Sequence, residues 1–299
     1  MNERVRGYAA AAFESAAAAG RLEEVVAELV ELARALTRSS QLRQVLCDPG
    51  IEAATRAAIV GDLLEGGAAP SASLVAFAVR AENAREFTRV VAELVELGSA
   101  ALDRLRSGAP AQPEPAASRA LTRRRIGGYA ERVLEELAAV GEVEEVEDEL
   151  FRVARLVDDY PELRRALVDA NAPYAARAAV VADLLSGRAR PATVRLVSYV
   201  LRAGRVRDLV GTIEWLVELA ALERGRRLAE VRAAVELERA EADRLAAALA
   251  RLVGREVELR VVVDPSLVGG MLVRVGDLVI DGTLRQRFEH LRDLLAPGA

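Results

Sequence analysis

Apolar residues recur at steps of three and four along most of the chain, which is the spacing of one face of an α-helix. In an early stretch these positions are Leu22, Val25, Leu29, Leu32 and Leu36. Later in the chain the same spacing is repeated by Val143, Val146, Leu150, Val153 and Val157. Shorter apolar stretches follow each stripe and are separated by Gly and Pro, which interrupt helices. The pattern predicts compact helical bundles joined by short turns.

The two stripes belong to an internal repeat. Residues 8–64 and 129–185 align without a gap at an offset of 121, with 25 identities over 57 positions. At an offset of 122, residues 74–81 then match residues 196–203. A period of this length indicates a duplicated domain rather than a solenoid. We therefore expect two bundles of six helices, at residues 1–106 and 119–225.

The segment between the copies and the segment after them have different patterns. Residues 107–118 hold three prolines and no apolar stripe, which predicts a semi-rigid, extended linker. In residues 226–299 the apolar positions alternate from Ala229 to Val235 and from Val257 to Val263, which is typical of half-buried strands. Met271–Val275 and Leu278–Ile280 are predicted to be two short strands of a hairpin. Helical spacing returns over Ala242–Leu252 and from Leu284 to Leu295. The predicted fold is mainly α, with two tandem six-helix bundles followed by a small α+β C-terminal domain.

Composition and charge agree with this fold and exclude several functions. The chain is 52% hydrophobic but only 4% aromatic, which favours helical bundles over sandwiches. All 41 basic residues are Arg, the net charge is −5, and acidic residues are interleaved with them, so no extended nucleic-acid surface is expected. The single Cys47 excludes an internal disulfide and fits a reducing compartment. No apolar stretch reaches the length of about 18 residues that spans a bilayer.

Few residues could carry chemistry. His290 is the only histidine, so a His-based triad or a zinc site with several His is excluded within one chain. The pair Gly269-Gly270 is followed by no Lys, and we interpret it as a bulge or a close backbone approach rather than a phosphate loop. Cys47 aligns with Val168 and is expected to fill a core position. The sequence predicts no catalytic residue, no metal and no cofactor.

The C-terminal domain contains one long motif. It runs from Asp264 to Thr283 and joins an Asp-Pro turn, a Gly-Gly pair, an amphipathic hairpin with Gly-Asp, and Asp-Gly-Thr. It resembles the signature of the delta subunit of F-type ATP synthase, a family that includes the mitochondrial oligomycin-sensitivity-conferring protein. The signature positions are Asp264, Pro265, Gly269, Gly270, Gly276, Asp277, Asp281, Gly282 and Thr283. The second helical copy is similar to the family's N-terminal six-helix domain, and the first is an additional copy that most members lack.

The resemblance implies a non-catalytic stator subunit in the peripheral stalk, present as one copy per complex on the cytoplasmic face of the bacterial cell membrane. Its expected partners are the α subunits of the catalytic head, bound by their N-terminal helices, and stalk subunit b. In the family, the α-subunit helix binds a groove between the first and fifth helices of the bundle. The matching positions in this chain are Tyr129, Ala130, Val133, Leu134, Val194, Val197, Val200 and Leu201 in the second copy, and Tyr8, Phe13, Leu74 and Val75 in the first.

Other interpretations remain open at this point. Most of these groove positions could be core residues of their own bundle. A free-standing helical adaptor whose tandem bundles bind two partner helices is the second hypothesis. An enzyme with the loop Asp264–Gly270 as its site is the third. Because the second copy adjoins the C-terminal domain, we expect it to dock on the head, with the first copy tethered by the linker of about twelve residues.

Overall fold

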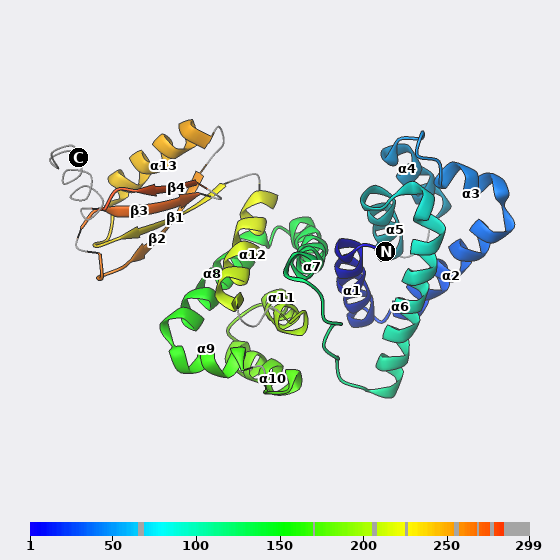
Figure 1. Ribbon diagram of the computed structural model, residues 1–299, viewed down its shortest axis with the longest axis horizontal. Helices are drawn as coiled ribbons and strands as arrows, with labels where there is room; N and C mark the ends of the chain where they lie inside the picture. Colours follow the sequence, from blue (N-terminus) through cyan, green and yellow to red (C-terminus); the bar gives the residue numbers. More distant parts are fainter. Residues whose placement is uncertain are drawn as a thin grey trace, which may run out of the picture. The chain divides into compact units, whose positions relative to one another are not determined.

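The computed structural model describes residues 1–64, 69–169, 171–204, 208–224, 227–253, 257–267, 269–275 and 278–283. The chain divides into two compact units (Figure 1). Unit 1 comprises Met1–Glu142 and Asp148–Leu216, and unit 2 comprises Val143–Glu147 and Val217–Ala299. The predicted fold class is confirmed, because helices make up most of the described residues and a small mixed sheet lies near the C-terminus.

The first copy, which we call bundle one, is helical throughout its described residues. Its helices are α1 (Glu3–Ala18), α2 (Leu22–Arg38), α3 (Ser40–Leu46), α4 (Ala53–Leu63), α5 (Ala69–Ala81) and α6 (Phe87–Ser107), with a 3₁₀ turn over Ala84–Glu86 before α6. Side chains cap two of the helix starts, since Asn2 and Ser39 accept backbone hydrogen bonds from Val5 and Leu42. Gly108 ends α6 in the left-handed conformation.

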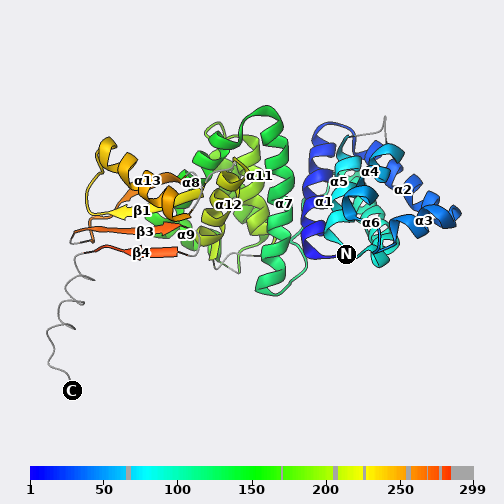
Figure 2. The same cartoon turned by 90° about the horizontal axis from the view of Figure 1, so that it is seen from above.

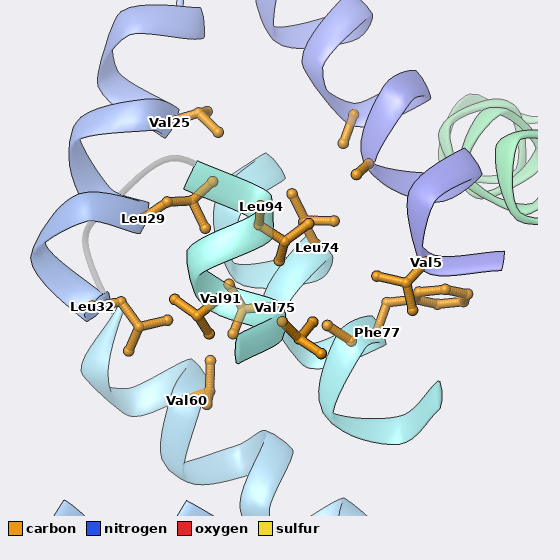
Figure 3. Close-up of a cluster of buried hydrophobic side chains, with 14 of the residues drawn as sticks. Val5, Val25, Leu29, Leu32, Val60, Leu74, Val75, Phe77, Val91 and Leu94 are labelled. Carbon is orange, nitrogen blue, oxygen red and sulfur yellow. The ribbon is translucent and has the colours of Figure 1, made fainter. Parts of the chain in front are cut away.

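The predicted apolar stripe of bundle one forms its core. Val25, Leu29 and Leu32 of α2 point toward α5 and α6, where they meet side chains such as Leu74 and Leu94 (Figure 3). All members of this cluster lie between Met1 and Leu102. Bundle one therefore has a hydrophobic core of its own, as an independently folded domain has.

The second copy, bundle two, repeats the same order of helices. They are α7 (Arg119–Val140), α8 (Val143–Asp159), α9 (Pro161–Val168), α10 (Tyr174–Leu185), α11 (Pro191–Arg202) and α12 (Leu209–Glu223). α7 begins at Arg119, where the Ser118 side chain caps the helix by accepting a hydrogen bond from the Leu121 amide. The stripe of α8 is buried as predicted, with Val146 and Leu150 both fully covered.

In the described residues of the C-terminal part of unit 2, a four-stranded sheet carries one helix. The strands are β1 (Arg227–Ala233), β2 (Val257–Val263), β3 (Met271–Val275) and β4 (Leu278–Asp281), in the order β2-β1-β3-β4. β1 and β2 are parallel, and β3 is antiparallel to both β1 and β4. Helix α13 (Arg239–Val253) connects the parallel pair and covers one face of the sheet, where Leu249 meets Ala229 and Val231 (Figures 1 and 2).

A buried carboxylate joins the two chain segments of unit 2. Glu147, near the start of α8, is fully buried and accepts hydrogen bonds from Arg224 at 2.9 Å and from Arg260 of β2 at 2.9 Å. Arg224 also contacts Glu144 at 2.9 Å. A buried carboxylate requires such partners, because its desolvation is otherwise costly. Glu147 therefore fixes the start of α8 to the end of α12 and to the sheet.

Residues of the C-terminal motif shape the backbone at the end of the sheet. Asp264 accepts hydrogen bonds from the amide and the hydroxyl of Ser266, at 3.0 and 2.6 Å, and these bonds lower the pKa of the Asp264 carboxyl. Asp281 accepts a bond from the Thr283 amide at 2.9 Å. Gly276, Asp277 and the expected final helix with His290 lie outside the described residues.

The backbone conformation at Gly270 explains why the motif has glycine at its second Gly position. Its φ is +83°, a conformation that residues with a Cβ rarely adopt. A Cβ at this position would also lie 2.3 Å from the carbonyl oxygen of Gly282, closer than van der Waals contact allows. The close backbone approach that we expected at the Gly-Gly pair is thus present at Gly270.

Replacing Gly270 by Ala should therefore destabilise the C-terminal domain by about 1–3 kcal/mol, through backbone strain and the contact with Gly282. Gly282→Ala is the matched control, since its Cβ would meet the Met271 oxygen at 3.2 Å with no positive φ. Chemical denaturation followed by circular dichroism gives both values. Equal stability of Gly270→Ala and wild type would show that the glycine is not required for the backbone.

Candidate functional site

Helices α1 and α7, the first helices of the two copies, lie side by side within unit 1 (Figures 1 and 2). Two glycines allow this close approach. A Cβ at Gly7 would lie 1.8 Å from the carbonyl oxygen of Arg125, and a Cβ at Gly128 would lie 1.8 Å from that of Arg4. The two glycines are related by the repeat offset of 121, as are Arg4 and Arg125. The α1–α7 interface is therefore pseudo-symmetric, with backbone meeting backbone at its centre.

The same symmetry relates two tyrosine–carboxylate pairs. The Tyr8 hydroxyl of α1 donates a hydrogen bond to Glu135 of α7. The Tyr129 hydroxyl of α7 donates one to Glu14 of α1 at 2.5 Å. Tyr8 is equivalent to Tyr129, and Glu14 to Glu135, at the offset of 121. Each bundle thus supplies a donor to the other and receives one in return.

The tyrosine rings are held within their own bundles. Tyr8 stacks on Phe77 of α5 with ring centroids 3.9 Å apart, and Tyr129 stacks on Tyr199 of α11 at 3.7 Å. Burial, then the bond to Glu135, raises the pKa of Tyr8, and burial, then the charge of Glu14, raises the pKa of Tyr129. Both hydroxyls therefore stay protonated and available as donors.

Arginines of α11 extend the interface around α1. Arg202 lies 2.6 Å from the second oxygen of Glu14, and Arg195 donates to the Ser15 hydroxyl at 2.8 Å. Burial tends to lower the pKa of Arg202, but Glu14 and the tyrosines outweigh it and the pKa is raised. Arg195 also lies 3.4 Å from the carbonyl oxygen of Ala11. Tyr129, Arg195 and Arg202 of bundle two thus converge on one turn of α1.

Additional ion pairs flank the central glycines. Arg125 of α7 binds Glu3 of α1 and is almost completely buried. Arg4 of α1 donates two hydrogen bonds to Glu131 of α7, at 2.8 and 2.5 Å, from a half-exposed position. The interface therefore combines a close backbone contact with buried and exposed charges.

The linker is bound to bundle two and does not run free. The Glu114 amide donates to the carbonyl oxygen of Arg202 at 2.9 Å, and Arg125 donates to the Pro115 oxygen at 3.0 Å. The Glu114 carboxylate lies 3.6 Å from Arg125 and 3.7 Å from Arg202. Bundle one packs on bundle two, and the linker between them is anchored beside this contact.

The predicted groove positions lie in and behind this interface. Those that are buried are Tyr129, Ala130, Val133, Leu134, Val197, Val200 and Leu201 in bundle two and Tyr8, Phe13, Leu74 and Val75 in bundle one. Val194 is half-buried. Leu74 and Val75 belong to the core of bundle one. Of the whole set, Tyr8 and Tyr129 are the residues whose side chains hydrogen-bond to the other bundle, and binding of a partner helix at these positions stays a prediction.

The polar residues of this surface, chiefly Glu14, Glu135, Arg195 and Arg202, were not predicted from the sequence. A signal for three of them was available. Glu14 and Glu135 are identical at the offset of 121 and each follows a repeated glycine by seven residues, and Arg202 is identical to Arg80 at the offset of 122. Arg195 gave no such signal, because it aligns with Ser73.

Within the described residues the arrangement has the chemistry of helix recognition. The part of the chain that the structure describes contains no group of three or more His, Cys, Asp or Glu side chains placed to hold a metal ion. Among those residues, no helix combines the length and the apolar character needed to cross a membrane. What the surface offers is a stacked tyrosine, two arginines and a glycine, which together fit a helix that carries a carboxylate.

Comparison with known proteins gives the family. The sequence profile described as ATP synthase delta (OSCP) subunit matches residues 5–106 and 127–295, which include most of both copies and the C-terminal domain. The chain belongs to the ATP synthase delta (OSCP) subunit family. The resemblance in the C-terminal motif predicted this family, and the prediction is confirmed.

Named members of the family match along nearly the whole chain. It is 37% identical to the ATP synthase subunit delta of Streptomyces avermitilis over 274 residues, covering 90% of this chain and 87% of that protein. It is 36% identical to the same subunit of Salinispora arenicola over 294 residues, covering 98% of this chain and 94% of that one. The predicted role as a stator subunit of the synthase is confirmed at the level of the family, and a free-standing adaptor is not favoured.

A solved structure is also similar in part. One chain of the mitochondrial ATP synthase hexamer of Toxoplasma gondii aligns over 58% of this chain and 98% of its own length, with 18% identity and a TM-score of 0.39. The family assignment comes from the sequence matches alone.

The α1–α7 interface should be sensitive to one added methyl group. Gly7→Ala places a Cβ against the Arg125 carbonyl, so the helices must separate, at a cost of about 1–3 kcal/mol. Gly61→Ala in α4 is the control, since its Cβ would meet nothing within 4 Å; it should be neutral or stabilise the helix by about 0.5–1 kcal/mol. Differential scanning calorimetry would show the contrast, and similar melting of the two variants would argue against a tight interface.

The two stacked tyrosines of bundle two should respond differently to loss of the hydroxyl. Tyr129→Phe removes a bond to a carboxylate and should cost about 1–2 kcal/mol. Tyr199→Phe should be neutral or stabilising, because the buried Tyr199 hydroxyl has no hydrogen-bond partner among the described residues. Bundle one already has Phe77 at that position of the repeat. Urea denaturation of both variants tests the assignment, which a larger loss for Tyr199→Phe would contradict.

Proposed function

We propose that this subunit ties the top of the catalytic head of the ATP synthase to subunit b of the peripheral stalk. In this function it carries load and catalyses no reaction of its own. Proton flow through the membrane part then drives ATP synthesis, because the head cannot turn with the rotor. The observation that carries the proposal is the family match over both helical copies and the C-terminal domain.

The head is held through helix recognition. The proposed ligand is the N-terminal helix of an α subunit, and the proposed surface is that of Tyr129, Arg195 and Arg202 on α7 and α11. An amphipathic helix that binds such a surface dissociates slowly without covalent chemistry. The three residues already hold a helix in this structure, since Glu14 and Ser15 of α1 occupy them.

The C-terminal domain is proposed to bind subunit b. Its hydrophobic core is small and formed between the sheet and α13, around Val231, Leu249 and Val273. The backbone around Gly270 gives the end of the sheet a fixed shape. We place the subunit on the cytoplasmic face of the bacterial cell membrane as a peripheral part of the membrane-bound complex, with one copy in each complex.

Removal of the C-terminal domain should separate the two binding functions. A chain that ends at Gly225 should lose binding to the soluble part of subunit b and still bind the isolated head. Glu147 keeps Arg224 as a partner in this chain, so its burial remains compensated after Arg260 is lost. Circular dichroism and thermal melting first establish that the bundles are folded. Pull-down of subunit b at wild-type strength by the shortened chain would contradict the assignment.

A further inference from the structure

We propose that the α1–α7 interface is a releasable latch, in which bundle one occupies the helix-binding surface of bundle two and a partner helix gains that surface only when bundle one undocks. This inference rests on the proposed function, because it concerns access to the same surface. The occupant seen on the surface also indicates the chemistry of the partner. It is an amphipathic helix with a glycine at the position of Gly7 and a carboxylate seven residues later, at the position of Glu14.

The surface of bundle two contacts both features, the glycine and the carboxylate, directly. Tyr129 and Arg202 bind one oxygen each of Glu14, at 2.5 and 2.6 Å. Both are charge-assisted contacts and define where a carboxylate must lie. At the other end, the backbone of α7 lies against that of α1, so any residue with a Cβ at the position of Gly7 on the bound helix would collide with the Arg125 carbonyl oxygen. A partner helix with the same two features would compete with α1 for the same atoms.

Bundle one keeps its own hydrophobic core when it leaves, because its core cluster is drawn from residues 1–102 alone. The side chains that form hydrogen bonds and ion pairs between the bundles belong to tyrosines, carboxylates and arginines, which water can solvate. Glu14 retains 35% of its side-chain exposure and Glu135 retains 44%, so both are already in contact with solvent. Polar interfaces between separately folded domains permit relative motion.

The buried arginines of bundle two keep a partner when bundle one departs. Arg125 would lose Glu3 but retain Glu114 and the Pro115 oxygen, and Arg202 would lose Glu14 but retain Glu114. An unpaired buried charge would otherwise make undocking costly. The anchored end of the linker thus stays on bundle two, and residues 108–113 before it are free to extend, by about 3 Å per residue.

A cavity borders the polar contact. It has a volume of about 540 Å³ and is lined by α1, α6, the linker and Arg202, with Glu14 on its wall. Glu14, whose side chain is 35% exposed, can therefore be hydrated from this side when it separates from Arg202.

A locked and an opened form of the full chain test the proposal. In a Cys47→Ser background, Arg4→Cys with Glu131→Cys would be joined by a short bismaleimide, which fixes α1 to α7. The control joins Arg155→Cys to Glu214→Cys, an ion pair within bundle two, by the same reagent. Glu14→Gln weakens the latch from bundle one and leaves the surface of bundle two intact. The probe is a labelled synthetic peptide of the N-terminal helix of the α subunit from the same organism, followed by fluorescence anisotropy.

The proposal predicts that the locked chain loses peptide binding and that the cross-linked control retains it. Glu14→Gln should bind the peptide roughly tenfold more tightly, because the apparent affinity rises with the fraction of molecules in which bundle one is undocked. Equal binding by the locked chain and by the same chain before cross-linking would overturn the latch and leave the proposed function in place. If neither the wild type nor Glu14→Gln binds the peptide, docking of the α-subunit helix in the proposed function fails, and the latch fails with it.

Discussion

The approach of α1 to α7 at Gly7 and Gly128 is the constraint on which the arrangement of the two bundles depends. Each glycine lies against a carbonyl oxygen of the facing helix, so the distance between the helices is set by backbone atoms and not by side chains. At this separation the Tyr8 and Tyr129 hydroxyls reach carboxylates on the opposite helix. A wider separation would leave these buried hydroxyls without acceptors, at a cost that buried polar groups generally carry.

Sequence periodicity was sufficient to predict the helices and strands, because each of them depends on the residues of one short segment. The stripe from Leu22 to Leu36 states directly which face is buried, and the structure buries that face. In β2 the alternation holds in part, because Val257, Leu259 and Val261 pack partly buried against the core of the sheet while Val263 is 44% exposed. The motif around Gly270 could also be interpreted from the residue types, since a glycine pair before a strand indicates a backbone conformation. One detail was wrong: Val235 lies beyond β1 and is 70% exposed, because the strand ends at Ala233.

The interface was harder to predict because it depends on which surfaces of the two copies meet. Tyr8 and Tyr129 were identified as surface candidates, but the acceptors of their hydroxyls lie on the other copy, more than 100 positions away in the chain. Helical periodicity contains no information about such a pairing. Composition indicated an extended linker, yet the contacts of Glu114 with Arg125 and Arg202 depend on the bundles being folded. The residues that identify the family, in contrast, shape the backbone of a separate domain.

The duplication has not left two interchangeable halves. On the contact surface, bundle two carries Glu131, Arg132 and Arg195 where bundle one carries Ala10, Ala11 and Ser73. Arg195 reaches the backbone oxygen of Ala11 because that side chain is only a methyl group. A chain built from two copies of bundle two would place an arginine at this position and bring two cations together. Long charged side chains from one copy and small residues from the other are therefore complementary, and this mutual fit commits each copy to its own place in the order of the chain.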